Sequence, residues 1–526
     1  MQILAFIGFT LFVAIISYFQ SRKTNENSSD GYFLGGRSLS GVVVAGSLLL
    51  TNLSTEQIVG LNGAAFKEGI LVMAWETLAA IAMVVTAVYL LPRYLTGGIT
   101  TIPQFLERRY DTFTKTMTSA LFLSGYVVVL LPIVLYSGAL AINAMFDVPA
   151  MLGVSQTTAL WITVFGIGII GAIYAIFGGL RAVAVSDTIN AIGLLIGGLM
   201  IPIFGLLAIG DGSIGDGIST LITAHPEKFN SLGGPEASVP FGTIFTGMLL
   251  VNLFYWGTNQ AIIQRALGAK NLKEGQKGLL LAAFIKILGP LIVVLPGIIA
   301  FHMFGEQLQN PDEAYPKLIT EVLPASLVGF FAAVLFGAIL SSFNSALNSS
   351  VTLFGVDIYK TYFNKEASEK QIVKAGKRFG IILAIFAMCI APFIANAPDG
   401  LFGYLQKVNG CYSIPILTII IVGYLTKYVP AIAAKTAMIS GVLLYLAYIL
   451  LDEFIFPGAF PHFLHVMAIL FVCNVLVMLA IGKFAPRDTA YEQYQSNAVV
   501  VNPWKYLKPV GITICLIVIA IYYIFS

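Results

Sequence analysis

Fourteen apolar stretches constrain the fold of this chain more than any other feature. A helix needs roughly 20 apolar residues to cross the hydrocarbon core of a bilayer. None of the stretches alternates as a barrel strand would, and a helix satisfies its own backbone within hydrocarbon. We therefore predict an all-α integral membrane protein with about fourteen transmembrane helices, at residues 2–20, 39–62, 70–95, 115–145, 152–177, 183–208, 241–266, 276–302, 324–357, 376–394, 400–425, 431–451, 461–482 and 509–525.

The composition agrees with that class. Charged residues make up 10% of the 526 residues, whereas soluble domains carry about 25%. The four cysteines lie in apolar runs, so no disulfide framework is indicated. No Walker phosphate loop occurs, and no nucleophile triad or metal cluster falls within a span. We expect a protein that is not an enzyme, has no nucleic-acid partner and functions as a monomer in the bilayer.

The distribution of Lys and Arg predicts the orientation. If the N-terminus lies outside, the segments after every odd-numbered span face the cytoplasm, and these segments with their flanks hold most of the 29 basic residues. The outer loops keep Lys67, Lys228 and Lys317. Basic residues gather on the cytoplasmic side of membrane proteins. We therefore predict a cell-membrane protein with both termini outside and a first span that is retained rather than cleaved.

Two of the spans contain an abrupt polar segment. One is Val251 to Arg265 (VNLFYWGTNQAIIQR), and the other is Thr51 to Gln57 (TNLSTEQ). Both patterns indicate discontinuous helices whose breaks form part of a binding site. They lie five spans apart, so spans 2–6 and 7–11 have opposite orientations, as in an inverted repeat with its site at the midplane.

The predicted domains follow from that repeat. Residues 1–38 form an extra helix and a cytoplasmic loop, and residues 39–208 form the first five-helix repeat. Residues 209–240 are an extracellular loop, and residues 241–425 form the second repeat. Residues 426–526 add three C-terminal helices.

Charged groups inside a bilayer are costly and usually functional. The candidates are Glu56, Glu76, Asp187, Lys286 and Lys407. A buried pair of Glu76 and Lys286 has a purely structural explanation, because each neutralises the other. The functional alternative is a polar cavity shared with Gln57, Asn252 and Gln406. Amides, a carboxylate and an ammonium together suit an uncharged polyhydroxylated ligand, whose hydroxyls both donate and accept. Tyr255 or Trp256 would stack on the apolar face of a sugar ring. An amino acid remains an alternative ligand.

The ninth span carries hydroxyls and amides within about one helical turn, at Ser341, Ser342, Asn344 and Ser345. Such residues often only bond back to their own helix or allow close packing. The alternative is an alkali-ion site, because small hard cations prefer oxygen ligands. Carbonyls freed at the break in span 2, near Leu50 and Leu53, would complete it. Asp187 is a candidate for a second ion, with proton coupling and a structural hydrogen bond as alternatives.

Several longer motifs occur in one order along the chain: DGYFLGGRSL (30–39), NLSTEQIVG (52–60), FGGLRAV (177–183), NLFYWGTNQAIIQR (252–265), AAFIKILGPLIVVLPG (282–297), and LSSFNSALNSS (340–350) with DIYK (357–360). On these motifs the chain resembles the sodium/solute symporter family, and most closely the bacterial sodium/galactose symporters of the sodium/glucose cotransporter group. The resemblance implies a LeuT-type five-plus-five inverted repeat with discontinuous first helices and alternating access.

The resemblance also implies a set of site residues. The substrate positions fall on Gln57, Glu76, Asn252, Tyr255, Lys286 and Gln406, with Tyr255 as the inner gate. The outer hydrophobic gate falls on Leu61, Trp75 and Phe402. The sodium site falls on the carbonyls of Leu50, Leu53 and Ala338 and the hydroxyls of Ser341 and Ser342. A second sodium site falls on Asp187, Ser341, Asn344 and Ser345.

Three departures from the galactose symporters bear on the substrate. Ala79 replaces a serine of the sugar site, Trp75 replaces a gate tyrosine, and Lys407 replaces an acidic residue. We predict Na⁺-coupled symport of a monosaccharide such as glucose or galactose, with one or two Na⁺ ions. The alternatives are Na⁺-coupled symport of myo-inositol, sialic acid or an amino acid, and a sugar-binding sensor without net transport.

Overall fold

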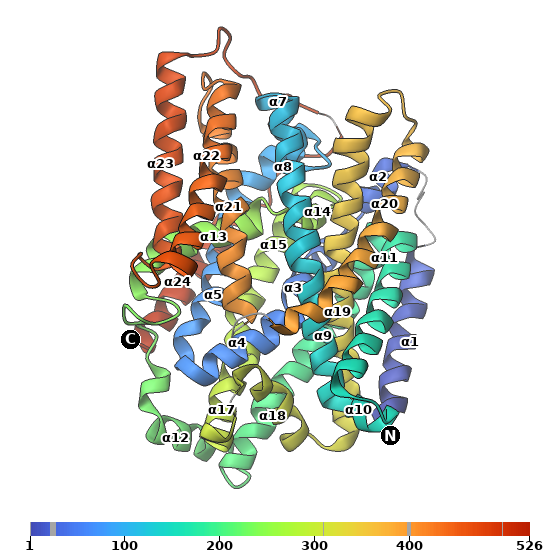
Figure 1. The fold of residues 1–526 in the computed structure, drawn as a ribbon, viewed down its shortest axis with the longest axis vertical. Helices are drawn as coiled ribbons and strands as arrows, with labels where there is room; N and C mark the ends of the chain where they lie inside the picture. Colours follow the sequence, from blue (N-terminus) through green and yellow to red (C-terminus); the bar gives the residue numbers. More distant parts are fainter. Residues whose placement is uncertain (1, 22–27, 309, 397–400, 497) are drawn as a thin grey trace.

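The computed structural model describes residues 2–21, 28–308, 310–396, 401–496 and 498–526. Over these ranges the regular structure is helical, apart from one isolated bridge between Leu39 and Ala269. Figure 1 shows an elongated bundle with most helices running along its long axis. The predicted all-α class is confirmed.

The elements of the first half lie between residues 2 and 245. They are α1 (Gln2–Ser21), α2 (Ser29–Leu34), η1 (Gly35–Arg37), α3 (Gly41–Asn52), α4 (Thr55–Glu68), η2 (Gly69–Met73), α5 (Ala74–Val85), η3 (Thr86–Leu90), α6 (Leu91–Gly97), α7 (Ile102–Arg109), α8 (Thr112–Ser124), η4 (Gly125–Leu130), α9 (Leu131–Phe146), α10 (Val148–Leu152), α11 (Gln156–Ile209), α12 (Ile214–Ala224), η5 (Pro226–Phe229) and η6 (Phe241–Phe245).

The elements of the second half lie between residues 247 and 524. They are α13 (Gly247–Gly257), α14 (Gln260–Leu267), α15 (Leu272–Ile287), α16 (Gly289–Val293), α17 (Leu295–Phe304), η7 (Gly305–Gln307), η8 (Pro311–Glu313), α18 (Ala314–Val322), α19 (Ala325–Thr352), η9 (Leu353–Phe363), α20 (Glu369–Ile390), η10 (Ala391–Asn396), α21 (Leu401–Leu425), α22 (Ala431–Leu450), η11 (Leu451–Ile455), α23 (Phe463–Phe484) and α24 (Leu507–Ile524).

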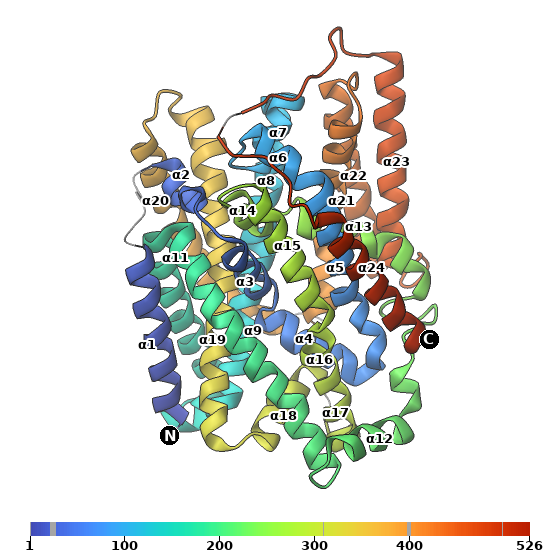
Figure 2. The ribbon, with the colours of Figure 1, turned by 180° about the vertical axis from the view of Figure 1, so that it is seen from behind.

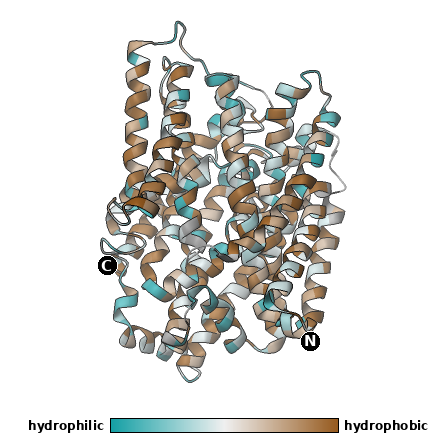
Figure 3. Ribbon diagram, in the orientation of Figure 1, coloured by the Kyte–Doolittle hydropathy of each residue, from teal (hydrophilic) through white to brown (hydrophobic). Residues whose placement is uncertain are grey.

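The apolar helices coincide with the predicted spans. In the described part of the chain, ten helices are long and apolar enough to cross a membrane. A pair bent by 49°, covering residues 272–304, adds another span, and shorter apolar helices lie at Gln2–Ser17, Gly41–Asn52 and Gly247–Gly257. Hydrophobic residues run along the helices in Figure 3. The chain is a multi-pass membrane protein.

One continuous helical run, residues 55–97, contains parts of two predicted spans. The chain turns within it at Gly69, whose φ of 80° and ψ of −149° lie outside the helical region. A Cβ atom on Gly69 would lie 2.3 Å from the carbonyl oxygen of Lys228. Glycine therefore serves both the positive φ and the close approach, and it lets α4 and α5 belong to different spans.

The segment predicted as an extracellular loop, residues 209–240, contains regular helical structure. It contains α12 and η5. The next connection on that side contains α18, whose Tyr315, Leu318 and Ile319 are buried. In Figure 1, α12, α17 and α18 gather at one end of the molecule together with the N-terminus.

Two broken helices lie in the middle of the bundle. In Figures 1 and 2 the chain runs down from α2 through α3 to α4, and it runs up from α12 through α13 to α14. Helices α5, α11 and α19 pack closely around them, together with α15 and α21. Helices α22, α23 and α24 lie at the edge, with large exposed apolar side chains such as Leu443, Leu476 and Leu516. Exposed apolar side chains on the outside of a multi-pass membrane protein are suited to contact with lipid.

Candidate functional site

The two breaks fall within the predicted polar segments. Between α3 and α4 the backbone leaves the helical region at Leu53 (ψ 59°) and Ser54 (ψ 177°). Between α13 and α14 it does so at Thr258 and Asn259 (ψ 120°). Each break frees the last carbonyls of one half-helix and the first N–H groups of the next.

The second break is stabilised by its own side chain. Asn259 caps α14 by accepting a hydrogen bond from the Ala261 N–H at 3.0 Å. The Tyr126 hydroxyl donates to the same Asn259 oxygen at 2.6 Å. Asn is a favoured N-cap because its short side chain reaches back to the backbone. Asn259, an unusual residue for the interior of a membrane helix, therefore marks the start of the second half-helix, α14.

A polar pocket lies beside both breaks. Its walls come from the two broken helices and from α5, α15, α21 and η4. The lining residues are Asn52, Glu56, Gln57, Trp75, Leu130, Val251, Asn252, Tyr255, Trp256, Asn259, Lys286, Leu405, Gln406, Asn409 and Tyr412. Five of the six predicted substrate residues therefore line one pocket, and Glu76 is the sixth.

Glu76 lies behind the pocket wall and is fully buried. Lys286 donates hydrogen bonds to the Glu76 carboxylate and to the Asn52 side-chain oxygen. Gln57 Nε2 donates to the other Glu76 oxygen at 2.7 Å. A Cβ on Gly289 would lie 2.4 Å from Glu76 Oε2, so the missing side chain at Gly289 makes room for the carboxylate. The pair fixes where Lys286 stands in the wall.

The other predicted pocket residues are held by weaker contacts. Asn252 donates to the Met248 carbonyl of its own helix at 3.0 Å. Gln406 Oε1 accepts a 3.5 Å hydrogen bond from Asn409 Nδ2, and Asn409 accepts a 2.5 Å hydrogen bond from the Tyr412 hydroxyl. The Asn252 side-chain oxygen and the Gln406 side-chain nitrogen take no part in these hydrogen bonds, so they can bond to a ligand.

Of the residues predicted to form the outer gate, one lines this pocket in the described part of the chain. Trp75 lines it. Leu61 is fully buried in the apolar core and is not among the lining residues. The side chain of Phe402 lies outside the part that the structure describes.

Several lining residues were not singled out as ligands from the sequence. Asn52 and Asn259 stand within the two polar segments, so the pattern that predicted the breaks could also have indicated these two residues as ligands. Asn409 and Tyr412 follow Gln406 at helical spacing, which places them on one face of α21. Glu56 was noted as an intramembrane charge without a place in the site.

The predicted sodium site lies where α3 ends against α19. The Ser342 hydroxyl donates to the Thr51 carbonyl at 3.0 Å, which ties α19 to the last turn of α3. Ser341 is buried beside it, and its hydroxyl has no hydrogen-bond partner. Leu50 and Leu53 supply carbonyls that the break frees from the helix. The arrangement offers a small hard cation several oxygens.

The predicted second sodium site lies next to the first. Ser47 donates to Asp187 Oδ2 at 2.6 Å. Asp187 Oδ1, Ser341 Oγ and Asn344 Oδ1 are buried and without a hydrogen-bond partner. Ser345 is engaged instead, by Thr51 Oγ1 at 3.0 Å and by the guanidinium of Arg265. Unpartnered buried oxygens are costly, and a bound cation would satisfy them.

Lys407 points away from the pocket. Its ammonium lies 3.0 Å from Asp452 Oδ2 and 2.6 Å from Glu453 Oε1, both in η11. The adjacent residue Gln406 faces the pocket. Lys407 therefore joins α21 to η11, and it is not among the residues that line the pocket.

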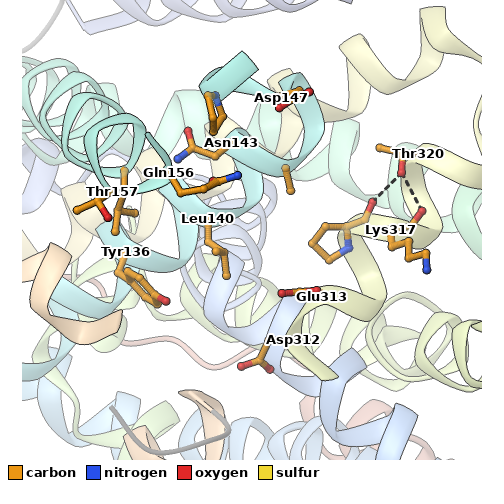
Figure 4. Close-up of a pocket in the computed structure, with 14 residues that line it drawn as sticks. Tyr136, Leu140, Asn143, Asp147, Gln156, Thr157, Asp312, Glu313, Lys317 and Thr320 are labelled. Carbon is orange, nitrogen blue, oxygen red and sulfur yellow. Dashed lines mark hydrogen bonds between the residues drawn. The ribbon is translucent and has the colours of Figure 1, made fainter. Parts of the chain in front are cut away.

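A second cavity, of about 610 Å³, lies outside this polar pocket. Figure 4 shows Tyr136, Asn143 and Asp147 on one side of it, and Asp312 and Lys317 on the other. Its walls come from α9, α10 and the start of α11, and from η8 and α18. None of the predicted substrate or sodium residues lines it.

Comparison with known proteins gives a consistent set of relatives. A model of the sodium:solute symporter family matches residues 32–443. The chain is 51% identical over 522 residues to the uncharacterized symporter YidK of Escherichia coli, covering 99% of this chain and 90% of the relative. It is 33% identical over 462 residues to a sodium/glucose cotransporter of Vibrio parahaemolyticus, covering 82% and 83%. A sodium/myo-inositol cotransporter of Sus scrofa is 30% identical, with coverage of 87% and 70%.

Solved structures confirm the LeuT-type fold. A substrate-bound, outward-open Na⁺-coupled sialic acid symporter matches with a TM-score of 0.79 at 20% identity, covering 93% of this chain and 98% of the other. A nucleobase-cation-symport-1 family transporter in a closed conformation matches with a TM-score of 0.57 at 14% identity, covering 88% and 96%.

Proposed function

Because the chain belongs to the sodium:solute symporter family, whose coupling ion is Na⁺, we propose that it is a secondary active transporter for a monosaccharide such as glucose or galactose. It lies in the cell membrane, functions as a monomer and has both termini outside. The inverted repeats, residues 39–208 and 241–425, rock around the pocket to give alternating access.

One observation carries the proposal: the ion site and the pocket share the last turn of α3. The Thr51 carbonyl accepts from Ser342 on α19, and the next residue, Asn52, accepts from Lys286 in the pocket wall. An ion that holds α3 against α19 therefore also positions Asn52 and Lys286. By linkage, Na⁺ and substrate must raise each other's affinity by the same factor.

The pocket chemistry supports a neutral polyol as the substrate. Its walls combine amides, an ammonium and a carboxylate with the aromatic rings of Trp75, Tyr255 and Trp256. Each sugar hydroxyl both donates and accepts, and the amides of Gln57, Asn252 and Gln406 do the same. Gln57, Glu76, Asn252, Tyr255, Lys286 and Gln406 are the proposed substrate residues, with Glu76 acting through Lys286 and Gln57. Leu61, Trp75, Tyr255 and Phe402 are the proposed gates.

The proposed ion ligands fall in two groups. Leu50, Leu53, Ala338, Ser341 and Ser342 hold the first Na⁺. Asp187, Ser341 and Asn344 hold a second, and Ser345 joins them when Arg265 releases it. The unpartnered oxygens of Asp187, Ser341 and Asn344 support this second site.

The test is uptake of labelled glucose and galactose into proteoliposomes with an inward Na⁺ gradient. We expect accumulation above the outside concentration, which disappears when K⁺ replaces Na⁺ and when the gradient is collapsed. Uptake that persists in K⁺ medium would contradict Na⁺ coupling.

Two alternatives are separated by the same preparation. A sodium/myo-inositol cotransporter is among the relatives, so unlabelled myo-inositol, sialic acid and amino acids are added as competitors to identify another solute. A sensor would bind sugar in a Na⁺-dependent manner without accumulating it. Binding and flux measured on one sample distinguish it from a transporter.

A further inference from the structure

The pocket wall carries a carboxylate that is not among the proposed substrate residues. Glu56 lies in the first turn of α4, lines the pocket and is 6% exposed. Its Oε2 atom is buried and has no hydrogen-bond partner. Among the described lining residues, Glu56 is the acidic one. A buried acceptor atom without a partner is costly, unless something that binds there supplies a donor.

Glu76, the carboxylate that the family resemblance places at the substrate, is in the opposite situation. One of its oxygens accepts from Gln57 and the other accepts from Lys286. It is fully buried and does not line the pocket. Each Glu76 oxygen thus accepts one hydrogen bond from within the protein. Glu56 is the carboxylate that lines the pocket, so a ligand hydroxyl in the pocket has Glu56 within its walls.

The backbone explains how Glu56 is held at this place. It stands at the start of α4, directly after the break, and its N-cap Ser54 makes no capping hydrogen bond with its side chain. The partial positive charge of a helix N-terminus favours an anion there. Tyr255 and Asn259, from the second break, line the same pocket. The carboxylate thus faces the space between the two broken helices.

We propose that Glu56 is a direct ligand of the substrate and determines its specificity, by accepting a hydrogen bond from one hydroxyl of a neutral polyol. The inference rests on the proposed function. It goes further in adding Glu56 to the proposed substrate ligands, beside Glu76, which also positions Lys286. When Glu56 is ionised, its charge also repels an acidic sugar, which favours neutral polyols over sugar acids.

The alternative role for Glu56 is purely structural, as an anion that stabilises the start of α4. That role predicts equal damage to sugar and Na⁺ binding, because the break between α3 and α4 also forms the first Na⁺ site. A direct contact predicts a selective effect on the substrate. The experiment therefore needs a substrate series as well as a Na⁺ titration.

The experiment compares the full-length chain with E56Q in proteoliposomes. Inhibition of labelled galactose and glucose uptake is measured with deoxy analogues that each lack one hydroxyl, and with glucuronate. E492Q, on the exposed segment between α23 and α24, is the control and should match the unchanged protein. E56D, which keeps the carboxylate, is the second variant if E56Q does not give a monodisperse protein.

We expect E56Q to raise the half-saturation concentration for sugar at least tenfold and to shift that for Na⁺, at saturating sugar, less than threefold. Loss of a hydrogen bond to a charged group has that size. One deoxy analogue should bind at least tenfold more weakly to the unchanged protein and lose nothing further in E56Q, because both changes remove one contact. Glucuronate should compete better in E56Q.

Three results overturn the inference. Sugar affinity within twofold of the unchanged protein, or the same deoxy profile in both proteins, means that Glu56 does not contact the substrate. Equal shifts for sugar and Na⁺ assign it to the structural role. If the unchanged protein takes up neither sugar, the proposed function fails, and the polyol assignment of Glu56 fails with it. If uptake is normal and E56Q has no effect, only the Glu56 inference fails.

Discussion

Two polar clusters lie at the breaks, and their hydrogen bonding differs. Around Glu76 and Lys286 both carboxylate oxygens and the ammonium have partners inside the protein. Around Asp187, oxygens from α11 and α19 have none. A cluster satisfied by its own contacts positions groups, whereas a cluster that leaves acceptors open is suited to a cation. The role of a buried polar residue therefore depends less on its charge than on which of its atoms lack a hydrogen-bond partner.

The largest effect is expected from removing Lys286, which tests whether the satisfied cluster positions groups that transport requires. Breaking a buried ion pair by removing one partner costs about 3–5 kcal/mol, because the other charge stays buried without compensation. We expect Lys286→Ala to lower Na⁺-driven uptake at least a hundredfold. Lys273→Ala, which changes an exposed residue on the same helix, is the matched control and should keep full uptake.

A double variant separates folding from function at this pair. Lys286→Met with Glu76→Leu replaces both charges by apolar side chains, which typically restores stability. We expect a folded protein without uptake. A double variant that still accumulates sugar would show that the pair is only structural.

The second largest effect should come from Asp187. Asp187→Asn removes the charge of the cluster and nearly keeps its shape. If Asp187 binds a second ion, the half-saturation concentration for Na⁺ should rise at least tenfold, since bonds to charged groups contribute about 1.5–3 kcal/mol, and the Hill coefficient should fall towards one. Thr188→Ala is the control, because the Thr188 hydroxyl donates mainly to the Ala184 carbonyl of its own helix at 2.7 Å and reaches the Val43 carbonyl of α3 only at 3.5 Å. An unchanged Na⁺ titration would leave Asp187 with a structural hydrogen bond.

A smaller effect is expected at Ser342, which supplies one neutral oxygen. Ser342→Ala should weaken Na⁺ binding about fivefold, because a neutral hydrogen bond or ligand contributes on the order of 1 kcal/mol. Ser350→Ala on the same helix removes a buried hydroxyl that bonds only to the Ala346 carbonyl, and it should leave the Na⁺ titration unchanged. Equal behaviour of the two variants would argue against the first ion site.

The smallest effect is expected at Lys407, although the sequence singled it out as a departure from the galactose symporters. Its ion pairs with Asp452 and Glu453 are partly exposed, and such pairs contribute at most about 1 kcal/mol. Lys407→Met should change sugar affinity less than threefold in the uptake assay. A tenfold change, or a change in preference between glucose and galactose, would place Lys407 in the pocket after all.

The sequence predicted the fold and most pocket residues because the signals are local. Hydropathy marked the spans, and polar residues inside apolar runs marked both breaks to within a few residues. It did not place Glu56 in the wall and Glu76 behind it, although Glu56 stands in the polar segment at the first break and Glu76 stands in an apolar run. Their difference depends on Gly289, whose missing side chain leaves space for Glu76. The helices within 209–240 were missed because glycine and acidic residues there resemble a loop.

The sequence by itself determined that the chain crosses the membrane many times, that two helices are broken, and which residue types stand at each break. These properties depend on the transfer of side chains and backbone groups into hydrocarbon, which each segment determines on its own. Only the tertiary structure decided which buried polar atoms are partnered. Hydrogen bonds between Ser342 and Thr51, or between Lys286 and Asn52, join residues more than two hundred positions apart. Their existence depends on how the helices are rotated and packed against each other.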